Sequence, residues 1–200
     1  MKKRFALLTT LFVIVLGCSA PRRATSQDKK PQSQATPSAA ESKAAQAMKG
    51  LRNKLLTSSA EDLGLSGKDA QAKVWAVLME VALGEAVSTI VSIRDGTASL
   101  YTSTGGGILG GYSAKDQAKR FVLEAEKHVA GMKLTTSFPY PEAGRLKFYV
   151  LTNDGVYTGE AEEKELLSGH HALSPLFLAG NDVITGLRTA SEQVKPAARP

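Results

Sequence analysis

Residues 19–43 contain no isoleucine, leucine, valine, phenylalanine, tyrosine or tryptophan, and they are rich in proline, serine, glutamine, alanine and lysine. Such a segment cannot bury enough apolar surface to offset the entropy lost on ordering it, so it is predicted to be a disordered tether. The folded part of this 200-residue chain must therefore lie after it. We expect one domain over residues 44–190, followed by a disordered tail over 191–200.

The first 17 residues have the pattern of a secretory signal peptide. Lys2, Lys3 and Arg4 precede an apolar stretch of 12 residues over 5–16, which is the charged-then-apolar order of such peptides. Because a membrane-spanning helix needs about 20 apolar residues, a retained anchor helix is disfavoured. A second interpretation of these residues is an ordinary signal peptide, in which the cysteine at position 18 is incidental.

The apolar stretch ends in Val15-Leu16-Gly17-Cys18, which resembles the lipobox of bacterial lipoproteins. The resemblance implies cleavage before Cys18 and lipidation of its thiol, so that the mature chain begins with an acylated cysteine held in the lipid bilayer. Two or three acyl chains make a lasting anchor. In this family an aspartate after the cysteine retains the protein in the inner membrane. Because Ser19 stands there, the outer membrane is favoured if the cell has two membranes.

The net charge of +6 is distributed unevenly along the chain. Residues 1–18 carry +3, residues 19–49 carry +4 and residues 50–200 carry −1. A nucleic-acid interface needs basic residues clustered on the folded domain, so this distribution gives no support for a nucleic-acid partner. The basic tether suits an anionic membrane surface, or it is simply a solvated linker. The single cysteine excludes an internal disulfide framework and a multi-cysteine metal site.

The folded part alternates between helical and strand patterns. A first helix is expected near Ala44, and a second is expected to be capped at Ser66 and to carry an apolar stripe from Val74 to Ala82. Asp95-Gly96 between two apolar runs is a strong hairpin signal, and a further cap at Ser113 opens a helix that ends near residue 132. The expected strands are 86–94, 97–103, 133–138, 145–152 and 156–161, with helices over 162–167 and from 174.

This order predicts an α+β fold with a mostly antiparallel sheet of about five strands and helices packed on it. The order α-β-β-α-β-β-β-α over residues 68–190 resembles the roadblock family and its longin and profilin-like relatives. The resemblance implies a domain that dimerises or docks a partner protein and has no catalytic activity. The glycine run after the second strand departs from the family pattern.

That run, Gly105-Gly106-Gly107-Ile108-Leu109-Gly110, matches the G-x-G-x-x-G pattern of nucleotide-binding loops. A dinucleotide site also needs a parallel β-α-β unit and an acid on the next strand, and Glu124 and Glu126 instead fall within the expected helix. One interpretation is structural, with glycines that permit positive φ and close packing. In another, free amides at the helix start bind an anion or a partner's carbonyls. The candidate binding loop comprises Thr104, Gly105, Gly106, Gly107, Gly110 and Gly111.

No set of residues in the sequence forms a catalytic constellation. His170 and His171 are adjacent, so they lack the i, i+4 spacing of a helical metal site, and His128 is expected to be structural. No nucleophile, base and orienting group come together, so no enzyme activity, metal or cofactor is predicted. The leading hypothesis is a lipid-anchored protein of the cell envelope whose domain binds a protein partner or forms a homodimer. The alternative is a small-ligand or anion binder, or an enzyme, that uses the loop Gly105–Gly111.

Overall fold

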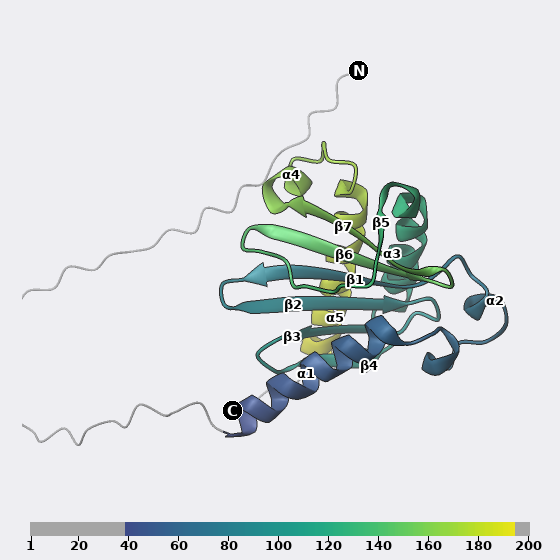
Figure 1. The fold of residues 1–200 in the computed structure, drawn as a ribbon. Helices are drawn as coiled ribbons and strands as arrows, with labels where there is room; N and C mark the ends of the chain where they lie inside the picture. Colours follow the sequence, from purple (N-terminus) through teal and green to yellow (C-terminus); the bar gives the residue numbers. More distant parts are fainter. Residues whose placement is uncertain (1–38, 195–200) are drawn as a thin grey trace, which may run out of the picture. The chain divides into compact units, whose positions relative to one another are not determined.

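The computed structural model describes residues 39–194, and its side chains are described from 43 to 192. Within that range the fold is α+β, with seven strands in one antiparallel sheet of order β4-β3-β2-β1-β6-β7-β5 (Figure 1). The strands are β1 (Val74–Leu83), β2 (Ala86–Ile93), β3 (Ala98–Thr102), β4 (Gly107–Gly111), β5 (Lys133–Thr135), β6 (Arg145–Thr152) and β7 (Gly155–Glu162). The α-helices are α1 (Ala39–Thr57), α2 (Gly67–Ala70), α3 (Lys115–His128), α4 (Glu163–Leu167) and α5 (Ser174–Val194), and two 3₁₀ turns, Glu61–Leu63 and Val129–Gly131, lie between them.

Helices cover both faces of the sheet (Figure 1). On one face, Leu55 and Leu56 of α1 pack with Leu78 and Tyr149 in one hydrophobic cluster. On the other face, α3 and α5 pack against Met79, Ile90 and Phe148 in a larger cluster. The prediction of a mostly antiparallel sheet with helices packed on it is therefore confirmed.

The prediction of a helix over the stretch that follows Ser66 was wrong. Only the single turn α2 is helical there, and residues 74–83 form β1, which lies between β2 and β6. Val77 and Met79 face the α3 and α5 cluster, whereas Ala76 and Leu78 face the α1 cluster. A central strand buried on both faces is apolar at almost every position, so its sequence carries no period that distinguishes it from a buried helix.

The predicted hairpin around Asp95-Gly96 is confirmed as β2 and β3, with Ile90 opposite Leu100. The Asp95 carboxylate accepts hydrogen bonds from the backbone N–H of Thr97 at 2.7 Å and from its hydroxyl at 2.9 Å, and Gly96 has φ +98°. The next segment differs from expectation, because the glycine run ends in a further strand, β4. Four strands therefore precede α3, where two had been expected.

The remaining elements lie close to their predicted positions, with shifts at their ends. The helix predicted to begin at Ser113 is α3, but its N-cap is Ala114 and no side chain caps it; Ser66 likewise makes no cap hydrogen bond. Helix α1 begins at Ala39, before Ala44, and α5 continues to Val194. No helix within residues 39–194 combines the length and apolar composition that a membrane span needs. The predicted signal peptide, Cys18 and most of the tether lie outside the described residues.

Candidate functional site

The glycine run forms the turn and second strand of the β3–β4 hairpin. The Gly105 N–H donates to the Thr102 carbonyl at 3.1 Å, the Thr102 hydroxyl donates to the Gly105 carbonyl at 2.7 Å, and the Thr102 N–H donates to the Gly106 carbonyl at 3.2 Å. Beyond the turn, Gly107 pairs with Tyr101 and then Ile108 with Leu100. The candidate loop residues are therefore held together, with Thr104 to Gly106 in the turn and Gly107 to Gly111 in the strand.

Two positions of this run require glycine for different reasons. Gly107 has φ +146°, and a Cβ there would lie 2.3 Å from the Leu100 carbonyl oxygen. Gly105 has φ +110°, and a Cβ there would lie 2.9 Å from the Cβ of Ala44 in α1. At Gly107 a side chain would clash with the neighbouring strand β3. At Gly105 a side chain would clash with helix α1.

Strand β4 is the edge of the sheet, and its outer side has no strand partner within residues 39–194. Proteins usually protect such an edge with charged side chains, proline or a covering element, because its free N–H and C=O groups can pair with another chain. Here no charged residue or proline occurs from Ala98 to Ala114. Leu109 is 49% exposed and Tyr112 is 58% exposed. Within the described residues this edge therefore has no pairing strand on its outer side, and it is uncharged and partly apolar, while α1 passes against the turn at Gly105.

Polar contacts fix the end of this edge strand beside the β2–β3 turn. The Tyr112 hydroxyl donates to the Asp95 carboxylate at 3.0 Å, and the Lys115 ammonium lies 5.7 Å from the centre of the Tyr112 ring. The same Asp95 carboxylate orders its own turn through Thr97. Tyr112 is therefore held in place although it is exposed, so the edge is presented as a fixed surface.

A buried ion pair joins α1 to the middle of the sheet. Arg52 Nε lies 2.5 Å from Glu80 Oε1, and Arg52 Nη2 lies 2.8 Å from Glu80 Oε2, a two-pronged contact between side chains that are 4% and 0% exposed. The Thr89 hydroxyl also donates to Glu80 at 3.3 Å. The Arg52 guanidinium lies 4.2 Å from the ring centre of Tyr140 and 5.5 Å from that of Tyr149. Both charges are thus satisfied inside the protein.

The surroundings of this pair alter the acidity of its neighbours. Burial, and secondarily the Glu80 charge, raise the pKa of Tyr149 to about 12, and its hydroxyl donates to the Pro139 carbonyl at 2.6 Å. Burial likewise raises the pKa of Tyr101. For Arg52, burial lowers the pKa, but the hydrogen bonds and charge of Glu80 outweigh it, so the net shift is upward. The pair is enclosed and joined by two hydrogen bonds, which suits a structural role in holding α1 on the sheet.

Sequence reasoning missed this pair. Glu80 interrupts an otherwise apolar run over residues 74–83, and an acid in such a run signals a buried partner, since unpaired buried charges are very costly. The partner lies 28 residues earlier in a different element, so no local pattern identifies Arg52.

His128 and His171 both line one pocket, but each makes its hydrogen bond within its own segment. His128 Nε2 lies 3.1 Å from Glu124 Oε1 on α3, and His171 Nδ1 accepts the Leu173 N–H at 3.1 Å in the connection between α4 and α5. Across the part of the chain that the structure describes, no group of three or more His, Cys, Asp or Glu side chains is placed to hold a metal ion.

Comparisons with models of protein families, with curated proteins and with solved structures gave no match. Functional arguments therefore rest on the residues and their geometry.

Proposed function

We propose that this chain is a bacterial lipoprotein, anchored in the cell envelope through acylated Cys18, whose α+β domain self-associates through the outer edge of β4. The anchor part rests on the leader, in which a charged start and an apolar stretch end at Val15-Leu16-Gly17-Cys18. The sole cysteine of the chain stands where the lipobox requires it.

The unprotected β4 edge is the observation that carries the self-association part. An exposed strand can add a strand from another chain, with main-chain hydrogen bonds supplying the affinity. Two copies of one edge paired antiparallel are related by a twofold axis, the commonest symmetry of protein dimers. Leu109 lies in the middle of this edge and would meet its copy near the axis.

Charge favours a second copy as the occupant. Like charges placed opposite one another across paired strands are destabilising, and the β3–β4 hairpin carries no charge from Ala98 to Ala114. Residues 50–200 have a net charge of −1, so long-range repulsion between two domains is small. The alternative of an anion at the glycine loop is less favoured, because the N–H groups of Gly105 and Gly110 already donate to Thr102 and Ser99.

Cysteine crosslinking in membranes tests this proposal. Because Cys18 is the sole cysteine and its thiol would be acylated, Leu109→Cys introduces the one free thiol of the mature chain. Mild oxidation should then give a disulfide-linked dimer. Leu178→Cys is the matched control, since Leu178 is 58% exposed but lies on α5, and it should remain uncrosslinked. Equal crosslinking of both variants, or linkage of Leu109→Cys only to a different protein, would contradict self-association at β4.

A charged substitution tests whether the dimer forms through the β4 edge or through another surface. Leu109→Lys places like charges opposite each other across the proposed contact and should abolish the dimer in size-exclusion chromatography with light scattering. Leu134→Lys makes the same change on β5, the opposite edge, where Leu134 is 61% exposed, and should leave the dimer intact. Dimers that persist in Leu109→Lys would show that another surface associates.

A further inference from the structure

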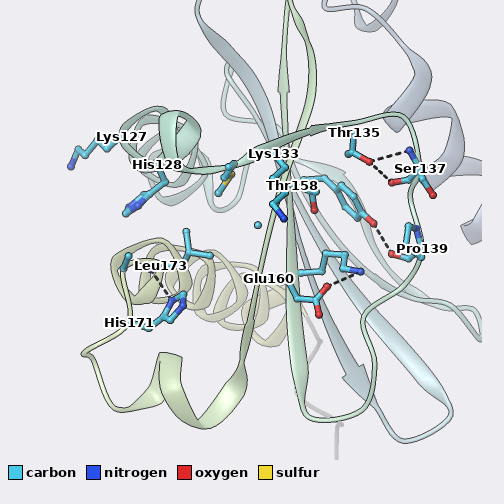
Figure 2. Close-up of a pocket in the computed structure, with 16 residues that line it drawn as sticks. Lys127, His128, Lys133, Thr135, Ser137, Pro139, Thr158, Glu160, His171 and Leu173 are labelled. Atoms are coloured by element: carbon cyan, nitrogen blue, oxygen red, sulfur yellow. Dashed lines mark hydrogen bonds and ion pairs between the residues drawn. The ribbon is translucent and has the colours of Figure 1, made fainter.

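A pocket opens on the side of the sheet opposite β4, at the β5 edge. It lies between the end of α3, the strands β5 and β7, and the connection from α4 to α5 (Figure 2). Its volume is about 690 Å³, within the range of about 300–1,000 Å³ typical of small-molecule sites. No residue of β4 lines it, so it is separate from the proposed contact between copies.

The lining is rich in cationic side chains. Lys127, Lys133 and Lys147 line the pocket with a single carboxylate, Glu160. Lys147 lies 2.9 Å from Glu160, and Arg145 contacts the same carboxylate, so that negative charge is already neutralised. Lys127 is paired with Glu124 and points away from the pocket in Figure 2.

Lys133 is the cation left available. Among residues 43–192 no carboxylate lies within ion-pair distance of its ammonium. It starts the edge strand β5, and Figure 2 shows it between His128 and Thr158 at the centre of the pocket. An ammonium with no internal counter-ion at the centre of a concave site is suited to receive an anion from solution.

His171 contributes an oriented donor on the facing wall. Its Nδ1 accepts the Leu173 N–H at 3.1 Å. In the neutral ring the hydrogen therefore sits on Nε2, which has no partner among the hydrogen bonds of the described residues. Figure 2 shows the ring at the pocket wall formed by the α4–α5 connection. The backbone bond holds the ring in place before any ligand arrives.

The floor of the pocket is apolar. Met132 and Leu173 line it beside Gly159 of β7. A Cβ at Gly159 would lie 3.2 Å from Leu173 and 3.3 Å from Met132, so these two apolar side chains pack directly against the glycine backbone. An apolar floor under a cationic rim matches a molecule with an anionic head and an apolar body.

We propose that this pocket binds a small amphipathic anion, a carboxylate joined to a compact apolar group. The carboxylate contacts the Lys133 ammonium and the His171 Nε2–H, and the apolar group covers Met132, Gly159 and Leu173. This assignment does not use the proposed contact between copies at β4.

Methionine-methyl NMR on the lipidated chain in phospholipid nanodiscs tests the proposal, with benzoate as the probe. The mature chain has three methionines, of which Met132 lies on the pocket floor, Met79 lies in the core and Met48 lies on α1. Benzoate should shift the Met132 signal saturably and leave the other two unchanged. Benzylamine carries a similar ring with the opposite charge and should produce no shift.

Variants at the rim show whether charge recognition is responsible. Lys133→Gln should weaken benzoate binding about fivefold to tenfold, as expected for the loss of one partly solvated charged contact, and Lys133→Arg should largely retain it. Lys164→Gln is the matched control, because Lys164 is an exposed lysine outside this pocket. Equal shifts from benzylamine, no Met132 response to benzoate, or full affinity in Lys133→Gln would each overturn the proposal.

Discussion

The ion pair between Arg52 and Glu80 determines how α1 is held on the sheet. Both side chains are withdrawn from water, and their mutual attraction, the Thr89 hydroxyl and the Tyr140 ring compensate for lost hydration. A buried pair of this kind adds little net stability relative to apolar residues of the same size. The pair instead fixes the position of α1, because Glu80 is paired only when Arg52 lies directly over it.

Breaking the pair from one side should therefore cost more than removing both charges. Arg52→Met leaves Glu80 buried and unpaired, and we expect the free energy of unfolding to fall by about 3–5 kcal/mol in urea denaturation. The double variant Arg52→Met/Glu80→Leu should recover most of that loss. Lys164→Met, which breaks the exposed pair with Glu162, should leave stability almost unchanged, because solvent screens an exposed ion pair. Additive losses in the double variant would show that the charges act independently.

The glycine run offers a second test at single residues, since two neighbouring glycines differ in surroundings. Gly106 has φ +83° with open space at its Cβ position, whereas Gly107 has φ +146° and would clash with the Leu100 carbonyl. Gly106→Val should cost about 1–3 kcal/mol from backbone strain alone. Gly107→Val should cost more and should also reduce dimer formation, because β4 must move away from β3. Thermal unfolding of both variants checks the ranking, and equal stability of Gly107→Val and the parent chain would refute it.

At the scale of elements, the sequence predicted β2, β3, β5, β6 and β7 but missed β1 and β4. Strand β1 is buried on both faces, so its apolar residues follow no period. Strand β4 is mostly glycine and exposed, so it carries too few side chains to show alternation. The predicted hairpin between β2 and β3 needed only the turn chemistry of Asp95-Gly96, which is local.

The candidate sites also differ in how far local sequence could predict them. The glycine run was singled out from its composition, and its residues do lie together in one hairpin. That this hairpin is an edge depends on the order of all the strands, which no local pattern contains. The pocket at β5 likewise combines Lys133 and His171, which lie on elements separated by β6, β7 and α4.

Helix α1 should depend on its buried side for stability far more than on its exposed side. Leu56 is 2% exposed in the cluster with Trp75, whereas Leu51 on the same helix is 43% exposed. Leu56→Ala should lower the free energy of unfolding by about 2–5 kcal/mol through lost burial and the cavity left behind. Leu51→Ala should change it by about 0.5 kcal/mol or less. Denaturant titration measures both, and similar effects of the two substitutions would mean that α1 does not pack as described.

For the whole molecule, stability and location arise from different parts of the chain. The two hydrophobic clusters and the Arg52–Glu80 pair lie between Met48 and Leu187. The features that predict lipidation lie in the first 19 residues. A change at the anchor should therefore alter where the protein resides without altering how its domain folds.

Cys18→Ser tests this separation. Without the thiol, no diacylglycerol can be attached, so cells fed an alkyne-tagged fatty acid should label the parent chain and not the variant. The variant should also be lost from washed membranes. Its thermal unfolding, followed by circular dichroism, should match that of the parent, because no residue of the clusters has changed. Ser19→Ala, one position along, is the matched control and should be labelled normally; equal labelling of Cys18→Ser and the parent would refute the lipid anchor.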